Sequence, residues 1–520
     1  MCNIPAFGEK TCIQNQENRH NRVFHIADAD DRSFDDYCAL FEGVAYVKKE
    51  EYRTPIHRFA ALSKGKQGVF INYYSFIREL RIVIEDFCRY FSYVDTCKNL
   101  SVSPQITQIM LEDFGMSYAI RLSDGRFVVI DGGYNFEPDR DRLFCCLKNE
   151  SPESKPIIAA WIMSHPHIDH YQCFIGFVDR YADEVLIEKV MLNFPEADDL
   201  EHYPDLSYKD ARFTDDVSEI TNIPRMLERI KRTGAQSNTL HTGQRYRIGD
   251  ADCEVLSCMD DTIHVSKNIN ATSLVIRMCL GGQTILWTTD AGFSYARLPE
   301  RYGSYLKADI LQVPHHGFQC GEASSEIRGY DLIKPQVCLL PVSDYSAYTF
   351  FCSYREGTRY LMNAANVKEI ITGSTQRTIT LPYTADDHVR REMKEKCARG
   401  ERDNGARTWV YTGLSTSCKE DFSFTLLNMT ALPATVDIEL FFEAKECAIR
   451  FIKAEIPASS LRTLCIIGEE ADGDALFFNG DSLKRKGIPE DVPFAVRFLC
   501  DKPMVVSHRH HAASYASMTF

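Results

Sequence analysis

The stretch Ser164-His165-Pro166-His167-Ile168-Asp169-His170 decides the fold of this chain, because it gathers metal-binding side chains at one point. The apolar run Ile157–Met163 before it has the composition of a buried strand. If that strand continued, His165 and His167 would face the same side of the sheet. Imidazole and carboxylate groups bind Zn²⁺, Mn²⁺ and iron. The stretch therefore predicts a metal site at the end of a strand, where loops often carry function.

Three other expected strands end on residues of the same chemistry. Asp131 follows the run Phe127–Ile130, Asp290 follows Thr284–Thr289, and His315-His316-Gly317 follows Ala308–Pro314. A single carboxylate after a strand is weak, since aspartate is a common turn residue. Four strands with such ends indicate one shared site along one edge of a sheet.

The order of these motifs resembles the metallo-β-lactamase superfamily, over residues 104–386. More narrowly it resembles the branch found in competence-type DNA-internalisation proteins, in which a Ser-Leu-Val strand, here Ser273–Ile276, precedes the metal-binding aspartate. The resemblance implies an α/β fold, the four-layer αβ/βα sandwich. It also implies two divalent metal ions at one edge of the paired sheets, Zn²⁺ or Mn²⁺, with iron as a further candidate.

The resemblance also implies a role for each residue of the motifs. His165 and His167 would bind the first metal, Asp169 and His170 the second, and Asp290 both. One of the paired histidines, His316 in preference to His315, would complete the second metal site. Asp131 would orient the histidine ligands from behind. Asp169 would also be catalytic, orienting a hydroxide and passing on a proton.

One ligand of the wider family is missing from this pattern. The family has a histidine between the first motif and the bridging aspartate, and the candidates in that interval are His202, His241 and His264. None of them stands at an expected strand end followed by glycine and proline. The coordination of the first metal therefore stays open.

Two further domains are expected on either side of residues 104–386. Residues 1–103 read as a small α+β domain of unknown role, with strands over Thr54–Phe59, Gln67–Tyr74 and Glu79–Glu85. The charged segment 387–407 reads as an exposed helical linker. Short alternating strands over 408–520 predict an all-β sandwich.

The C-terminal segment resembles the sensory rhodopsin transducer family. The runs that carry this resemblance are Phe478–Asp481, Ile488–Phe494 and Asp501–His508. Those proteins are small oligomeric β-sandwiches proposed to bind small ligands, so the resemblance implies a homo-oligomer formed through this domain. His508, His510 and His511 read as polar residues at a strand end rather than as another metal site.

Composition narrows the class of protein. The 520 residues are 44% hydrophobic and 25% charged, which is ordinary for a soluble globular chain. The net charge of -14 argues against broad binding to long nucleic acid. The 19 cysteines include no Cys-x-x-Cys pair and predict free thiols in a reducing cytoplasm. Neither a signal peptide nor an apolar membrane span is evident, so we expect a cytoplasmic protein without a membrane partner.

The expected function is metal-dependent hydrolysis. A pair of divalent metals makes hydroxide available near neutral pH and stabilises charge in the transition state. The substrate class that the resemblance favours is a phosphodiester: a nucleotide, a short oligonucleotide or another small diester. Two alternatives stay open, namely a lactone or thioester hydrolase of the same fold, and a ligand-sensing or oligomeric scaffold with a structural metal site. The retained Asp169 and Asp290 favour an enzyme.

Overall fold

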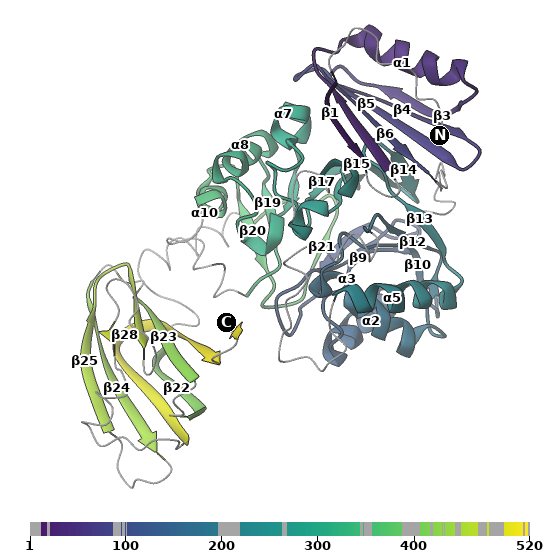
Figure 1. Ribbon diagram of the computed structural model, residues 1–520. Coiled ribbons are helices and arrows are strands. Elements are labelled where there is room, and N and C mark those ends of the chain that lie inside the picture. Colours follow the sequence, from purple (N-terminus) through teal and green to yellow (C-terminus); the bar gives the residue numbers. More distant parts are fainter. Residues whose placement is uncertain are drawn as a thin grey trace. The chain divides into compact units, whose positions relative to one another are not determined.

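The structure is a computed structural model (Figure 1) that describes most of the chain as two compact units. The first unit ends at Asp386, and the second begins, among the described residues, at Ala406. The described residues are 12–17, 21–86, 95, 99, 101–195, 219–262, 268–343, 347, 356–386, 406–415, 420–428, 430, 432–442, 449–465, 476–477, 493–512 and 515–517.

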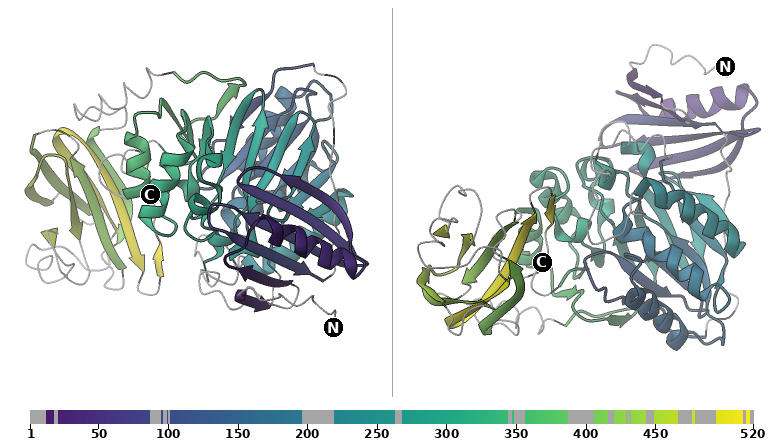
Figure 2. Two further views of the ribbon diagram at one scale, coloured as in Figure 1. Left: turned by 90° about the horizontal axis from the view of Figure 1, so that it is seen from above. Right: turned by 60° about the horizontal axis from the view of Figure 1, so that its bottom comes forward.

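The first unit opens with an antiparallel sheet in the order β1-β2-β6-β5-β4-β3. One helix, α1 (Asp31–Gly43), covers a face of it, as Figure 2 shows. The helix starts at a capping box between Asp30 and Ser33. The strands are β1 (Cys12–Glu17), β2 (Asn21–Ile26), β3 (Val47–Arg53), β4 (His57–Lys64), β5 (Gln67–Tyr74) and β6 (Glu79–Glu85). The sheet and its helix have the α+β composition predicted for this region, and they belong to the same compact unit as residues 105–386.

The strand predicted from Thr54 begins three residues later, at His57. Thr54 closes a turn instead: its amide donates to the His57 carbonyl at 2.8 Å, and its hydroxyl accepts from the His57 amide at 2.9 Å. Pro55, inside this turn, has no N–H to give to a neighbouring strand.

Residues 105–386 form two sheets with helices outside both. The first sheet has the order β13-β12-β10-β9-β8-β7-β21, with β11 paired to β10. Its strands are β7 (Gln105–Gln108), β8 (Ser117–Arg121), β9 (Phe127–Asp131), β10 (Ile157–Ile162), β11 (Leu186–Ile187), β12 (Lys189–Leu192), β13 (Gln236–Thr239) and β21 (Arg377–Thr380). Helices α2 (Glu137–Glu150), α3 (Ile168–Tyr181) and α5 (Glu219–Thr233) lie beside it in Figure 1.

The second sheet has the order β14-β15-β16-β17-β18-β19-β20. Its strands are β14 (Arg245–Ile248), β15 (Ala251–Ser257), β16 (Val275–Leu280), β17 (Gln283–Trp287), β18 (Ile310–Gln312), β19 (Val337–Leu340) and β20 (Glu369–Thr372). Helices on its outer side are α7 (Leu298–Tyr302), α8 (Ala323–Ile333) and α10 (Glu356–Asn363). Shorter turns are α6 (Met259–Thr262), η2 (Ile269–Thr272), η3 (Gly303–Leu306) and η4 (Pro314–Gly317).

Apolar side chains from both sheets form one core between them. Ile130 and Ile162 of the first sheet share this core with Ile276 and Trp287 of the second. On the other face of the first sheet, Trp161 packs against rings of α3, 5.0 Å from Phe174 and 5.1 Å from Phe177 between ring centroids. Trp161 and Trp287 are both fully buried. The predicted αβ/βα sandwich is confirmed.

The residues Gln105–Glu112 predict a strand of that length, but β7 is shorter. It ends at Gln108, and the Ile109 amide makes a last bond to the Ser117 carbonyl at 3.0 Å. The chain then leaves the sheet, because the Glu112 amide donates to the Asp139 carboxylate on helix α2 at 2.9 Å. The released segment runs toward the first turn of α3, where the Met116 amide donates to the Asp169 carbonyl at 3.1 Å.

The second unit is built of strands, as predicted. They are β22 (Ala406–Ser415), β23 (Glu420–Asn428), β24 (Ala434–Phe442), β25 (Ile449–Ile456), β26 (Ser460–Cys465), β27 (Leu476–Phe477), β28 (Pro493–Ala512) and β29 (Tyr515–Ser517). Ala406 and Arg407 belong to β22 rather than to the predicted helical linker, and 387–405 lies outside the described residues.

The alternating residues of Phe494–Phe498 and of Met504–His508 predict two separate strands, but both runs belong to one long strand, β28. Its first part pairs with β24 as far as Cys500, and its second part pairs with β23 from Val505 onward. Pro503 lies at the change of partner, where a missing N–H costs no bond to either of those strands. The runs Phe478–Asp481 and 488–492, which carried part of the second resemblance, lie outside the described residues.

Candidate metal centre

Four strand ends of the first unit converge where the two sheets share an edge. Asp131 ends β9, the segment 164–170 follows the parallel neighbour β10, Asp290 follows β17, and 315–316 follow the parallel neighbour β18. The strand β10 ends at Ile162, so His165 and His167 lie in the loop before helix α3 and not on a strand. Asp169 and His170 belong to the first turn of that helix.

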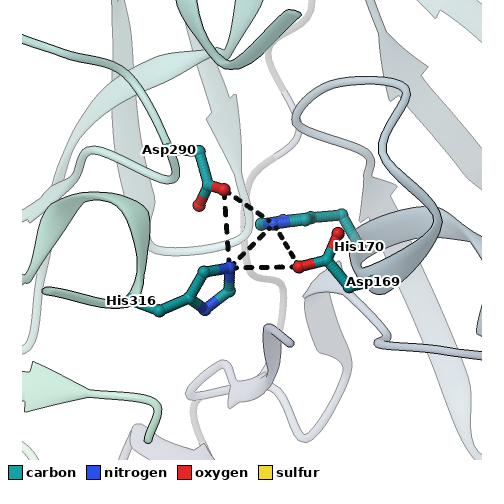
Figure 3. Close-up of side chains that lie close together, drawn as sticks. All are labelled: Asp169, His170, Asp290 and His316. Carbon is teal, nitrogen blue, oxygen red and sulfur yellow. Dashed lines mark hydrogen bonds and ion pairs between the residues drawn. The ribbon is translucent and has the colours of Figure 1, made fainter. Parts of the chain in front are cut away.

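A first group of four buried side chains, Asp169, His170, Asp290 and His316, has its donor atoms within 4.8 Å of one another (Figure 3). The Nε2 atom of His170 lies 3.2 Å from His316 Nε2 and 3.2 Å from Asp290 Oδ2. The Asp169 Oδ2 atom lies 3.2 Å from His316 Nε2 and 3.4 Å from His170 Nε2. Two carboxylates and two imidazoles thus point at one small volume.

A second group, His165, His167 and Asp290, shares the aspartate with the first. The His165 Nε2 atom lies 3.0 Å from His167 Nδ1 and 3.8 Å from Asp290 Oδ2. His315 lies on this side of the site, with its Nε2 atom 4.0 Å from Asp290 Oδ2. The structure thus brings together all seven residues that the sequence assigned to two metals.

Asp131 lies behind both groups and fixes the protonation of their histidines. Its Oδ2 atom is 2.8 Å from His170 Nδ1 and accepts from the Ser164 hydroxyl at 2.7 Å. Because the hydroxyl proton of Ser164 goes to Asp131, its oxygen accepts from His165 Nδ1 at 3.0 Å. Both imidazoles therefore carry a proton on Nδ1 and turn Nε2 toward the site.

Strained backbone holds several of these residues in place. Asp131, Thr289, His315 and His316 all have positive φ, between 46° and 55°, a conformation that costs about 1–3 kcal/mol each for residues other than glycine. Gln312 braces two of these turns: its Oε1 accepts from the Thr289 amide at 2.5 Å, and its Nε2 donates to the Val313 carbonyl at 2.6 Å. Such strain, concentrated beside the clustered side chains, is typical of a functional site.

The close packing around Asp290 also requires a glycine. A Cβ on Gly292 would lie 2.0 Å from the carbonyl oxygen of Cys320, so any other residue would move the turn. The small residues after the strand-end aspartate therefore serve to bring the backbone close.

The buried carboxylates dominate the electrostatics of the first group. Burial disfavours the charged form of His170, but Asp290, Asp169 and Asp131 outweigh it and hold its pKa well above the usual range. Burial likewise opposes protonation of His316, yet Asp290 and Asp169 raise its pKa to about 9. By contrast, burial and the nearby His170 hold the pKa of His165 well below normal. The group therefore attracts positive charge.

These residues fit a divalent cation. The Asp290 Oδ1 and His316 Nδ1 atoms are buried without a hydrogen-bond partner. Within the described residues, every ion-pair partner of Asp169 and Asp290 is a histidine, with no lysine or arginine to neutralise the carboxylates. Imidazole nitrogens and carboxylate oxygens are the donors that Zn²⁺, Mn²⁺ and iron take. The cluster therefore suits a divalent metal site.

The histidine missing from the first metal site is not supplied by the candidates that the structure describes. His241 has both ring nitrogens against carboxylates, Nδ1 2.8 Å from Asp260 and Nε2 2.9 Å from Glu85, and it stacks on Phe70. It belongs to the contact with the N-terminal sheet. His202 and His264 lie outside the described residues.

A residue that sequence reasoning passed over lies against His165 and His315. Asn270, on η2, is buried with its Oδ1 atom 3.1 Å from His165 Nε2 and its Nδ2 atom 3.0 Å from His315 Nε2. Its position three residues before the Ser273–Ile276 run was the available signal. An amide in a short turn carries no pattern that separates it from an ordinary cap.

Several other expectations can be placed on the structure. Each of the ten cysteines whose state is described is a free thiol. His508, His510 and His511 all belong to β28. Among the described residues, no helix is long and apolar enough to cross a membrane.

The chain was compared with known protein families, sequences and structures. Residues 111–319 match the profile of the Metallo-beta-lactamase superfamily, which confirms the resemblance stated from the motifs. No curated protein sequence matches the chain. Similar solved structures include an Anabaena sensory rhodopsin transducer, 19% identical, covering 20% of this chain and 95% of its own length with a TM-score of 0.16.

Two further solved structures are similar to parts of the chain. One is Thermotoga maritima 1070, 20% identical, covering 22% of this chain and 89% of its own, with a TM-score of 0.17. The other is a Beta-lactamase domain protein from Burkholderia ambifaria, 10% identical, covering 46% of this chain and 54% of its own, with a TM-score of 0.19.

Proposed function

We propose, from the metallo-β-lactamase superfamily match of residues 111–319, that the protein is a metal-dependent hydrolase acting on a small phosphodiester. The observation that carries the proposal is the position of one carboxylate oxygen, which lies close to both groups of side chains. Asp290 Oδ2 lies 3.2 Å from His170 Nε2, 3.4 Å from His316 Nε2 and 3.8 Å from His165 Nε2. A carboxylate shared between two groups of donors is the arrangement that a two-metal hydrolase needs.

The residues divide the work according to their burial and contacts. When bound, two divalent ions would supply Lewis-acid activation of water and stabilise developing negative charge. Asp290 is 2% exposed and can only hold the site together, whereas the Asp169 side chain is 11% exposed. Asp169 therefore has access to solvent and is placed to orient a water and take up its proton. Asp131 keeps the Nε2 lone pairs of His165 and His170 facing the site.

The substrate class rests on the sequence and its charge. The His315-His316-Gly317 ending resembles the branch of the superfamily whose members act on nucleic acid. A net charge of -14 disfavours long nucleic acid as the substrate. A nucleotide, a short oligonucleotide or another small diester meets both conditions. For the metals we propose Zn²⁺ or Mn²⁺, with iron as the further candidate.

Hydrolysis of bis(p-nitrophenyl) phosphate tests the proposal. The full chain is loaded with Mn²⁺ or Zn²⁺ and compared with Asp169→Ala and with Asp252→Asn, whose carboxylate is 65% exposed and remote in sequence from every motif. We expect metal-dependent turnover that Asp169→Ala abolishes and Asp252→Asn retains.

The other outcomes select between the alternatives. Bound metal without turnover would overturn the phosphodiester proposal and favour a lactone or thioester, which p-nitrophenyl ester and lactone screens would then reveal. A chain that binds no metal at all would leave a sensor or scaffold.

We also propose that the chain forms a homo-oligomer through its C-terminal domain, as the resemblance to the transducer family implies. Light scattering on the eluting chain, before and after removal of the residues from Ala406 onward, measures this directly. A monomer in both samples would contradict it.

A further inference from the structure

Two oxygen atoms lie close to the Nε2 nitrogen of His165, and both are hydrogen-bond acceptors. The Nδ1–H of His165 is committed to Ser164, as derived above, so its Nε2 carries a lone pair. Asn270 Oδ1 lies 3.1 Å from that nitrogen, and Asp290 Oδ2 lies 3.8 Å from it. Neither oxygen carries a proton, so a lone pair held against both in a buried site is disfavoured unless a cation, or the Nδ1–H of His167 at 3.0 Å, meets it.

The other end of the Asn270 side chain explains why the oxygen points inward. Its amide nitrogen donates to His315 Nε2 at 3.0 Å, which fixes the amide orientation and occupies the lone pair of His315. His315 is thereby engaged as an acceptor and is not free to ligate. The paired histidines thus have different tasks: His316 points into the four-residue group, and His315 holds Asn270.

The backbone around Asn270 is tied to both neighbouring motifs. Its own amide donates to the Asn268 side chain at 2.9 Å, which caps the short turn η2. Four residues on, the Leu274 amide donates to the Ser164 carbonyl at 3.1 Å. The Leu274 carbonyl accepts from the Thr289 hydroxyl, beside Asp290, at 2.8 Å. Asn270 is therefore positioned as firmly as the residues it faces.

We propose that Asn270 supplies the amide oxygen that completes the first metal site, in the place where the wider family has a histidine. This inference rests on the proposed metal centre. The first site then has the donors His165, His167, Asp290 and Asn270, and the second has Asp169, His170, Asp290 and His316. Because carbonyl oxygens suit Mn²⁺ better than imidazole does, the first site is the weaker for zinc and the more tolerant of manganese.

Metal content is the test, measured by elemental analysis after dialysis and by competition with a chelator. The wild-type chain should hold two equivalents and lose them in two steps. Asn270→Ala should lose the weaker equivalent and keep the other. Loss of a partner that only orients a ligand costs about 10–100-fold in metal affinity, and loss of a direct ligand should cost at least that.

Two conservative variants separate a ligating oxygen from a donated proton. Asn270→Asp keeps the oxygen and should retain two equivalents, whereas an asparagine that merely donated a proton to His165 could not be replaced this way. Asn270→His should raise zinc affinity at the weaker site by at least about tenfold and shift the zinc-to-manganese ratio toward zinc. The matched control is Asn268→Asp, which adds the same charge two residues away and keeps the cap.

The outcomes distinguish this inference from the proposed function. Two equivalents with unchanged affinity in Asn270→Ala would overturn the role of Asn270 while leaving the metal centre intact. Loss of the weaker metal equivalent in Asn270→Asp, with retention of both equivalents in Asn268→Asp, would also overturn it, because Asn270 would then act as a hydrogen-bond donor. A wild-type chain without metal would overturn both. The visible spectrum of the Co²⁺-loaded chain should change in Asn270→His and stay unchanged in the control.

Discussion

Two buried charged clusters of the first unit differ in one respect that separates a metal site from a structural contact. The Glu79 cluster (His25, Glu79, Arg297 and Arg301) joins the N-terminal sheet to helix α7 and the turn before it. Each oxygen of Glu79 meets a cationic or protonatable partner: Arg301 at 3.2 Å and His25 at 3.5 Å on Oε1, and Arg297 at 2.7 Å on Oε2. Both oxygens of the buried carboxylate are thus satisfied by members of the cluster.

The metal centre has the opposite balance. Its carboxylates are also buried, yet within the described part of the chain their ion-pair partners are all imidazoles, and nitrogens of these imidazoles also face each other. Among the described residues, none is a hydrogen-bond partner of Asp290 Oδ1. Buried charge is tolerated where donors and acceptors match, and a surplus of acceptors in one volume is costly without a cation. An excess of hydrogen-bond acceptors over donors is therefore what marks the metal centre, whereas burial and charge are common to both clusters.

The largest effect should come from Asp290→Asn, which removes the charge that both groups share. We expect loss of both metal equivalents and a fall in turnover of roughly 10³-fold or more, since the residues of the site act as a unit. Elemental analysis and steady-state kinetics measure the two losses. The exposed Asp252→Asn should change neither, and full retention of metal by Asp290→Asn would contradict the shared role.

Glu79→Gln tests the other side of the comparison. Neutralising Glu79 leaves the buried Arg301 without its partner, and breaking a buried pair in this way costs about 3–5 kcal/mol of unfolding free energy. Metal content should be unaffected. Arg297→Gln is the matched control: the Arg297 side chain is 49% exposed, so its loss should cost no more than about 1 kcal/mol. Urea unfolding decides between them, and equal losses would contradict the distinction.

The same carboxylate should make stability depend on acid. Burial alone would raise the pKa of Glu79, but the hydrogen bond with His25 and the charges of Arg301 and Arg297 outweigh it and lower the pKa from 4.5 to about 2. Because the folded value is depressed, the stabilisation is complete above pH 4.5 and is lost as the pH falls toward 2. The gap in unfolding free energy between wild type and Glu79→Gln should therefore narrow across that window. A constant gap would show that the charge of Glu79 is not what stabilises the contact.

Asp131→Asn should have a smaller effect, confined to the metal centre. The carboxylate accepts from His170 and the Ser164 hydroxyl on one oxygen and from the Ser164 amide on the other. An amide has one accepting oxygen, so its NH2 group would face a donor on one side and the histidine tautomers would no longer be fixed. Loss of such a partner typically costs about 10–100-fold in metal affinity, or about 1.4–2.7 kcal/mol. Chelator competition measures it.

Ser164→Ala sharpens this result with the smallest expected change. It breaks the link from Asp131 to His165 but keeps the 2.8 Å contact between Asp131 and His170. Only the first site should weaken, by less than in Asp131→Asn. Equal weakening of both sites would show that the serine does not act through His165.

Much of the metal centre could be predicted from the residues alone. The seven candidate ligands and Asp131 stand in short motifs after apolar runs, and the ends of neighbouring parallel strands must meet at one edge. Strands and the helix over 219–233 followed from periodicity. Where the predictions were wrong, as at Thr54 and at Pro503, a local turn or a change of strand partner overrode the pattern.

The sequence by itself determined the family resemblance, the fold and most of the candidate ligands, because these depend on short spacings and on strand-end chemistry. Only the tertiary structure decided which histidine of the 315/316 pair faces which group, that His241 is held by Asp260 and Glu85, and that Asn270 lies against His165. Those facts depend on contacts between residues that are up to 156 positions apart in the chain, as between His241 and Glu85 (241 − 85 = 156). Local pattern carries no record of such contacts, since a buried amide or imidazole has the same appearance in the sequence whether it binds a metal or fills a core.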